Sequence, residues 1–127
     1  MKKVGLVGGI GPESTISYYH DIVYGVQKRV GRDFFPDMSI ESIDLFKWVE
    51  LCDQKRYDEL VDFTLAPIQR LAASGADFAV LTANTAHLIF DQVQARSPIP
   101  LISIVEATAQ EAARRGYKKV GLLGTGF

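Results

Sequence analysis

The residues best placed to do chemistry are Asn84 and Thr85, in the stretch Leu81-Thr82-Ala83-Asn84-Thr85-Ala86-His87. This stretch follows an apolar run at residues 78–80, typical of a buried strand, and precedes residues 88–93, whose apolar spacing predicts a helix. An amide and a hydroxyl at such a junction can hydrogen-bond a small carboxylate, because unpaired backbone N–H groups and the helix dipole favour an anion there. The same spacing is also compatible with either residue simply capping the helix.

A second candidate is the glycine loop Gly8-Gly9-Ile10-Gly11-Pro12-Glu13, which follows a β-rich run at residues 4–7. A dinucleotide site needs a third glycine three residues after the second, and that position holds Ser14. Pro12 removes one N–H from the loop, and Asp44 lies farther along than the acid that binds a ribose. The loop therefore indicates either a plain turn or a backbone that approaches a small ligand closely.

The elements that must position these residues alternate between strands and helices. Strands are predicted at residues 4–7, 38–43, 78–80, 101–104 and 120–123. Helical periodicity covers residues 16–30, 57–71, 88–93 and 106–115, with a kink expected near Pro67. This alternation predicts an α/β fold, a parallel sheet flanked by helices, in which ligands bind at the carboxyl ends of the strands. Four predicted loops converge there, at residues 8–12, 45–48, 82–85 and 124–127.

Composition limits the class of protein. The chain has 127 residues, 47% apolar and 23% charged, with a net charge of −1. Such a chain can bury one core, and it gives no indication of a nucleic-acid or membrane partner. The single cysteine, Cys52, cannot form an internal disulfide, so we expect a reducing cytoplasm. Two isolated histidines predict no metal site, and His87 is expected to be structural.

The C-terminal residues predict the beginning of a further unit. Val120-Gly121-Leu122-Leu123-Gly124-Thr125 weakly echoes Val4-Gly5-Leu6-Val7-Gly8-Gly9. We therefore expect residues 1–115 to form a first α/β domain and residues 116–127 to start a second, similar one, as in the front half of a larger protein.

Two motifs of this chain resemble those of the aspartate/glutamate racemase family. Gly8-Gly9-Ile10-Gly11-Pro12-Glu13-Ser14-Thr15 followed by Tyr18-Tyr19 is similar to the opening motif of the family, and Asn84-Thr85-Ala86-His87 is similar to its Cys-Asn-Thr-x-His motif. Gly124-Thr125 followed by Phe127 resembles the start of its second half. The resemblance implies two pseudo-symmetric α/β domains, no cofactor and a homodimer, with one cysteine from each domain facing a shared cleft.

The resemblance also implies a mechanism. One thiolate removes the α-proton of an amino acid while a thiol on the opposite face delivers another, and stabilisation of the carboxylate replaces pyridoxal phosphate. In this chain the position of the first cysteine holds Ala83, which has no ionisable group, and the second cysteine would lie in the other half. We therefore expect this polypeptide not to racemise amino acids by the two-thiol route.

The remaining site residues follow from the same resemblance. Asn84 and Thr85 would hold the α-carboxylate of the substrate. The cleft would be lined by Gly9, Ile10 and Thr125. Related racemases carry an arginine near Lys47 to hold the side-chain carboxylate, so Lys47 would either serve that role or be a solvated lysine. Cys52 is expected to be a small buried residue and not a substitute for the missing thiol.

Two classes of function fit these observations. The favoured one is the N-terminal part of an aspartate/glutamate-type racemase whose substrate is a small amino acid or dicarboxylate. The alternative is a non-catalytic domain that binds a small carboxylate or a protein partner, and hydantoin racemases and maleate isomerases of the same superfamily also remain open. Ala83 is either an engineered substitution or a natural divergence.

Overall fold

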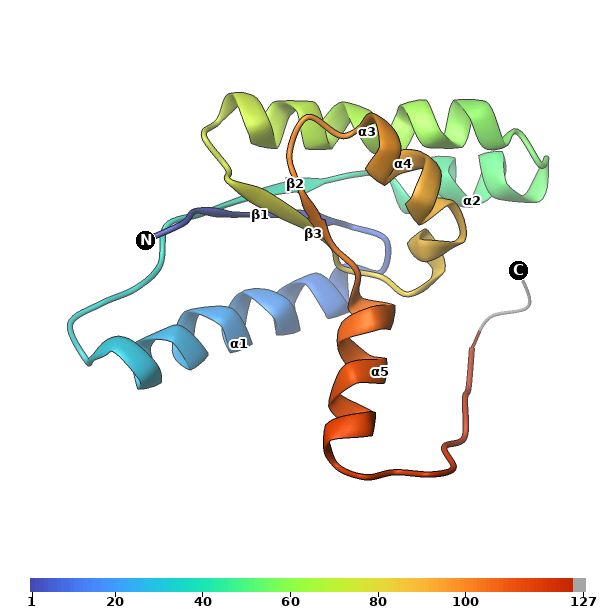
Figure 1. Cartoon of the computed structure of the whole chain (residues 1–127). Helices are drawn as coiled ribbons and strands as arrows, with labels where there is room; N and C mark the ends of the chain where they lie inside the picture. The colour runs from blue at the N-terminus through green and yellow to red at the C-terminus, as the bar shows by residue number, and fades with distance from the viewer. Residues whose placement is uncertain (125–127) are drawn as a thin grey trace.

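The fold is a four-stranded parallel sheet with helices on both faces, as the alternation predicts (Figure 1). The structure is a computed structural model that describes residues 1–124. The strands are β1 (Val4–Gly8), β2 (Met38–Ser42), β3 (Phe78–Leu81) and β4 (Leu101–Ile102), in the spatial order β2-β1-β3-β4. The helices are α1 (Pro12–Val30), α2 (Leu45–Asp53), α3 (Tyr57–Ala73), η1 (Thr85–Ile89, a 3-10 helix), α4 (Phe90–Arg96) and α5 (Ile104–Arg114).

The two faces of the sheet are covered unequally. Helices α2, α3 and α4 pack on one face, and α1 lies on the other (Figure 1). The larger core lies on the α3 face and includes Trp48, Leu60, Ile68 and Leu81, all fully buried. The α1 face has a smaller core of Val4, Leu6 and Val80, with partly buried neighbours that include Tyr18 and Ile104. β1 is buried throughout because both of its faces are covered.

The register of the strands aligns their carboxyl ends. Val7 of β1 lies opposite Glu41 of β2 and Leu81 of β3. The loops that follow these three strands therefore leave the same edge of the sheet, which is where a ligand site is expected.

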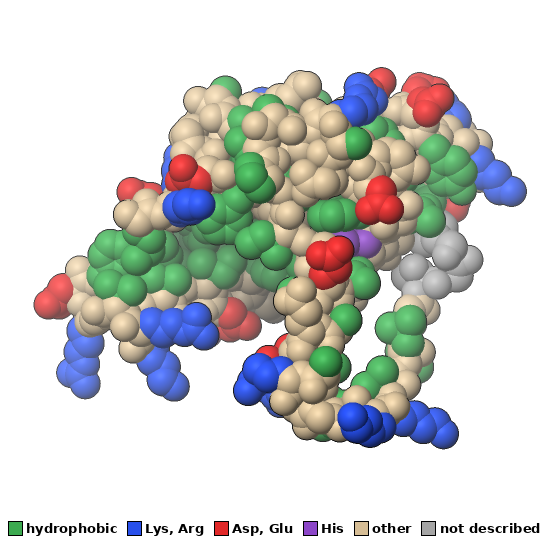
Figure 2. Space-filling view, viewed as in Figure 1, with side chains coloured by type: hydrophobic (Ala, Val, Ile, Leu, Met, Phe, Trp, Pro, Cys, Tyr) green, Lys and Arg blue, Asp and Glu red, His purple; other side chains and the backbone are tan. Residues whose placement is uncertain are grey.

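The predicted strand at residues 120–123 is wrong. The structure has no strand or helix in residues 117–124, and Val120, Leu122 and Leu123 are 69%, 94% and 99% exposed. A strand needs a neighbour that accepts and donates backbone hydrogen bonds, and none of β1 to β4 pairs with this segment. Its apolar side chains are instead exposed to solvent, on the segment that runs beside α5 (Figure 2).

A second correction concerns residues 45–48, which the sequence predicted as a loop. They form the first turn of α2, because Asp44 caps this helix and its Oδ1 accepts a hydrogen bond of 2.8 Å from Phe46 N. Trp48 is thereby fixed in the core instead of facing the carboxyl edge of the sheet.

Candidate active site

A pocket of about 380 Å³ lies at the carboxyl edge of the sheet, where the loops after β1 and β3 run side by side. Three helices begin around it: α1 at Pro12, η1 at Thr85 and α5 at Ile104. The lining residues are Ile10, Ser14, Tyr18, Thr82, Ala83, Asn84, Thr85, Ile104 and Thr108. Hydroxyl groups and one amide therefore dominate its polar surface, with apolar contacts from two isoleucines.

A chain of hydrogen bonds holds the two strand ends together. Gly9 N donates to Thr15 Oγ1 (3.1 Å), and Thr15 Oγ1 lies 3.0 Å from Thr82 Oγ1. Thr82 Oγ1 donates its single proton to Val7 O (3.1 Å). The hydrogen bond between the two threonine hydroxyls must therefore use the proton of Thr15, with Thr82 Oγ1 as the acceptor. Thr15 and Thr82 are both buried, and burial strengthens such a chain.

Ser14 adds a second tie between α1 and the end of β3. Its Oγ lies 2.7 Å from Thr82 O and 2.9 Å from Gly11 O. A hydroxyl has one proton, so the two carbonyls share it, and the shorter contact is the one to Thr82. Ser14 therefore fixes the peptide that leads into Ala83.

The glycine loop sets the backbone path beside the pocket and contributes few side chains to it. Gly9 has φ +89°, and a Cβ placed there would lie 2.3 Å from Ile43 O. Only glycine fits this close approach of the loop to the chain after β2. Gly9 does not line the pocket, whereas Ile10, 7% exposed, does.

Residues 83–85 lie at the mouth of the pocket. Ala83 is half-buried and Asn84 is exposed. The side chain of Asn84 makes no capping hydrogen bond. The alternative that Asn84 simply caps the helix is therefore wrong. The expected α-helix is also different, because the chain first makes a five-residue 3-10 helix and α4 starts only at Phe90. An anion here would therefore depend on side chains more than on a long helix dipole.

His87 connects this loop to α5. Ile104 N donates to His87 Nε2 (3.2 Å), so Nε2 carries no proton and Nδ1 donates to Ala83 O (3.1 Å). The ring stacks on Phe90 with centroids 4.9 Å apart. His87 thus has the structural role that the sequence predicted, and it holds the carbonyl of residue 83 in place.

Comparison with known proteins shows which family this chain belongs to. The sequence profile described as Asp/Glu/Hydantoin racemase matches residues 7–127. This chain belongs to that racemase family. The broad specificity amino-acid racemase RacX of Bacillus subtilis (strain 168) is 29% identical over 125 residues, which are 96% of this chain and 54% of that protein.

Solved structures of related racemases have the same fold. A protein of Yersinia pestis described provisionally as an Asp/Glu racemase superposes with a TM-score of 0.86 at 29% identity. An aspartate racemase homologue of Pyrococcus horikoshii OT3 superposes with a TM-score of 0.79 at 32% identity. Each match covers 91% of this chain and 50% of the other, so the chain spans about half the length of the relatives it matches.

Lys47 does not lie at the pocket of this racemase-family chain. It is in the first turn of α2, and its Nζ lies 3.0 Å from Glu50 Oε2. Lys47 is not among the residues that line the pocket, which opens between the ends of β1 and β3 and the helices α1 and α5, whereas α2 packs against α3 in the larger core. Thr125, the other residue expected in the cleft, lies outside the described residues.

Sequence reasoning did not assign five pocket residues, namely Ser14, Tyr18, Thr82, Ile104 and Thr108. Ser14 and Tyr18 are four residues apart on α1 and hence on one face of it, a signal that the sequence does contain. Thr108 comes from α5, and no local pattern links that helix to the glycine loop. Burial raises the pKa of the Tyr18 phenol, so it enters the pocket as a neutral donor at physiological pH.

The remaining candidates contribute nothing to the pocket. Cys52 is buried on α2, and the pKa of its thiol is raised by burial and then by the neighbouring Asp53 carboxylate. Residues 1–124 contain no group of three or more His, Cys, Asp or Glu side chains arranged to hold a metal ion. Within the same part of the chain, no helix has the length and apolar character required to cross a bilayer.

Proposed function

We propose that this chain is the N-terminal, substrate-binding unit of a cofactor-independent amino-acid racemase of the aspartate/glutamate type, acting in the cytoplasm as a homodimer. Asn84 and Thr85 bind the α-carboxylate, Ile10 lines the site, and Ala83 occupies the position from which a thiol would move the α-proton. Residues 1–115 form the first of two similar domains, and the second acid/base group comes from the other domain.

The single observation that supports this proposal most is the arrangement of Ala83, Asn84 and Thr85 on one pocket whose backbone is tied to the glycine loop. The α-proton of an amino acid is a very weak acid, so its removal requires stabilisation of the charge that develops on the carboxylate. Rigidly held donors beside the carboxylate provide that stabilisation without reorganisation. Ser14 and His87 fix the two carbonyls that flank this position.

Ala83 also favours a second candidate function, which is binding of a small carboxylate without turnover. A methyl group can neither take nor deliver a proton, so the pocket as it stands would hold an amino acid and leave its configuration unchanged.

The first test follows the α-proton signals of amino acids by NMR in D₂O, with the chain as given and with Ala83→Cys. One thiolate suffices to remove and return a proton on one face, so exchange does not need the second domain. We expect Ala83→Cys to accelerate exchange by about 10²-fold or more, the usual contribution of a positioned acid or base, while the chain with Ala83 stays at the buffer rate.

Ala73→Cys is the matched control, because Ala73 is exposed at the end of α3, remote from the pocket. Equal exchange in the two cysteine variants would show that any exposed thiol suffices and would contradict the proposed site. Saturable binding of amino acids without exchange in Ala83→Cys would favour the second candidate.

A further inference from the structure

Helix α5 forms one wall of the pocket but is weakly attached to the rest of the protein. It contributes Ile104 and Thr108 to the lining, although none of its residues is buried. Apart from its cap at Ser103, a single hydrogen bond joins α5 to the rest of residues 1–124, and it runs from Ile104 N to Nε2 of His87. The position of this wall therefore depends on a side chain that can take up a proton.

The bond to Ile104 requires the neutral form of His87. Nδ1 donates to Ala83 O (3.1 Å), so the proton of the neutral ring lies on Nδ1 and Nε2 accepts from Ile104 N (3.2 Å). Protonation places an N–H on Nε2 as well, and two N–H groups then face each other. The bond to Ala83 survives this change, whereas the bond to α5 does not.

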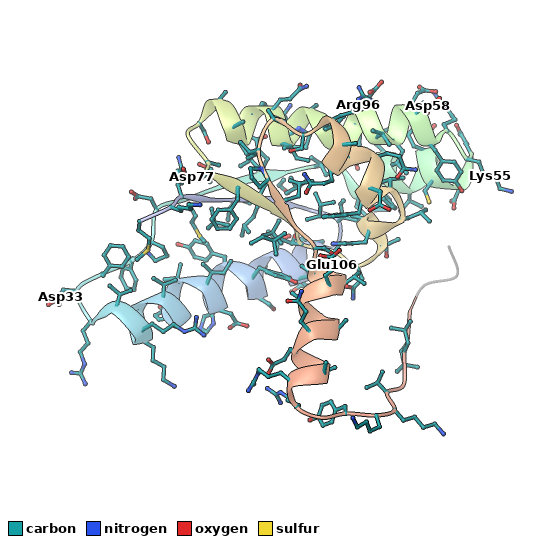
Figure 3. The ribbon with its side chains drawn as sticks, viewed as in Figure 1. Asp33, Lys55, Asp58, Asp77, Arg96 and Glu106 are labelled. Carbon is teal, nitrogen blue, oxygen red and sulfur yellow. The ribbon has the colours of Figure 1, made fainter. Side chains whose placement is uncertain are left out.

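The N-terminus of α5 also disfavours a positive charge on the ring. Ile104 is the first residue of α5, so its N–H belongs to the positive end of the helix dipole. A neutral acceptor nitrogen is stabilised there, and an imidazolium is repelled. Figure 3 shows Glu106, also in the first turn of α5, where the helix meets the body of the protein.

No ion pair within residues 1–124 stabilises a protonated His87. The helices α3, α4 and α5 contact η1 or its histidine. Their charged side chains on this side include Asp58, Glu59 and Asp62 of α3, Asp91 and Arg96 of α4, and Glu106 of α5. Glu59 pairs with Arg56 and Asp62 with Arg96, and none of the six forms an ion pair with the ring. Carboxylates ordinarily titrate below about pH 5, so a charge change in this region between about pH 5 and 8 belongs to the histidine.

From these contacts we propose that His87 is a pH-sensitive positioning residue, whose neutral ring holds α5 at the pocket and whose protonation releases the helix. The release itself involves no ligand. Its consequence for binding rests on the proposed function, since a released α5 removes Ile104 and Thr108 from the wall beside Asn84. The pocket should therefore bind a small carboxylate more weakly in mild acid.

The test is an NMR titration of the isotope-labelled chain from about pH 8 to about pH 5, the range in which histidine ordinarily changes charge. At the upper limit we expect the ring of His87 to carry its proton on Nδ1. As the pH falls, the amide signal of Ile104 should move with the same midpoint as the ring, and the residual dipolar couplings of α5 should decrease relative to those of α1. A proton on Nε2 at the upper limit, or an α5 that keeps its orientation after the ring is protonated, overturns the proposal.

Variants assign the transition to one histidine. His20 is the only other histidine of the chain and lies exposed on α1 beside Asp21, so His20→Gln is the matched control and should leave the transition of α5 unchanged. His87→Gln cannot titrate and should abolish it. His87→Phe keeps a ring that can stack on Phe90 and removes both nitrogens, so α5 should be released at every pH. A transition that persists in His87→Gln, or an α5 that stays in place in His87→Phe, overturns the proposal.

Binding of L-aspartate separates this inference from the proposed function. The carboxyl groups of this ligand ordinarily titrate below about pH 4, so a change in affinity between about pH 8 and 5 originates in the protein. We expect the dissociation constant to rise by about fivefold or more in acid, and to stay constant in His87→Gln. If L-aspartate binds equally at both limits although α5 is released, the link between α5 and binding is wrong. If it binds at neither, the proposed function fails, and the spectra of the free chain alone decide whether His87 releases α5.

Discussion

Thr82 is the residue that joins the two halves of the pocket. Its backbone N donates to Val7 O (3.0 Å), its hydroxyl donates to the same carbonyl, and its own carbonyl accepts from Ser14. Its Oγ1 also accepts from the Thr15 hydroxyl, which in turn holds Gly9 N. A single residue thus couples β1, the glycine loop and α1 to the peptide that carries Ala83.

Thr82→Val keeps the shape of the side chain and removes its hydroxyl. The buried Thr15 hydroxyl then loses its acceptor, so we expect the free energy of unfolding to fall by about 1–3 kcal/mol. Urea denaturation followed by tryptophan fluorescence measures this, because Trp48 is the only tryptophan.

Thr64→Val is the matched control for this substitution. Thr64 is also fully buried, but its hydroxyl donates only to Leu60 O within α3 (2.8 Å), and no second hydroxyl depends on it. We expect this variant to cost less than Thr82→Val. The reverse order would show that the hydroxyl chain at the strand ends adds little stability.

At the scale of elements, α5 is the least integrated helix. None of its eleven residues is buried, and in Figure 1 it projects away from the sheet. It is fixed at its first turn by the Ser103 cap and by the bond from Ile104 N to His87. A helix of this length has marginal stability in water unless it packs against the protein. The ion pairs within α5 therefore contribute more to its stability than they would in a well-packed helix.

Glu111 is the centre of those ion pairs and makes α5 sensitive to acid. Hydrogen bonds from Arg114 and then Arg115 lower the pKa of this carboxyl from 4.5 to about 2. Because the pKa is lower in the folded helix, the stabilisation is present above pH 4.5 and is lost as the pH falls towards 2. We expect the Cα chemical shifts of residues 109–114 to move towards coil values over that range.

Glu111→Gln should abolish this local transition, since an amide does not titrate. High salt should weaken it, because all three side chains are exposed to solvent. An unchanged transition in Glu111→Gln would assign the acid response of α5 to another group.

At the scale of the whole molecule, apolar surface remains uncovered on the α1 side. A groove of about 560 Å³ between α1 and α5 is lined by residues that include Ile22, Val80 and Ile102. The exposed segment with Leu122 and Leu123 lies beyond α5 (Figure 2). Exposed apolar surface of this kind is typical of a face that associates with other polypeptide.

We therefore expect the isolated chain to self-associate as its concentration rises. The double substitution Leu122→Asp with Leu123→Asp should lower the apparent mass in analytical ultracentrifugation, because it removes apolar area from the most exposed segment. The control is Gln69→Asp with Gln92→Asp, which adds the same charge at exposed polar positions. An unsubstituted chain that stays monomeric at every concentration would contradict this prediction.

The sequence alone determined the class of fold and the edge of the sheet where the candidate pocket lies. Both follow from local patterns: apolar runs and helical periodicity fix the order of elements, and Asn84 follows directly on the buried strand β3. The motifs at residues 8–15 and 84–87 also carried the family resemblance, which the racemase profile confirms.

Only the tertiary structure decided which side chains share the pocket. Ser14, Tyr18 and Thr108 come from α1 and α5, so their proximity to Ala83 depends on how helices pack on the sheet. Lys47 follows β2 closely in sequence, yet the Asp44 cap places it in the first turn of α2, and it does not line the pocket. The segment at residues 120–123 has the composition of a strand, but a strand forms only where a neighbour completes its backbone hydrogen bonds.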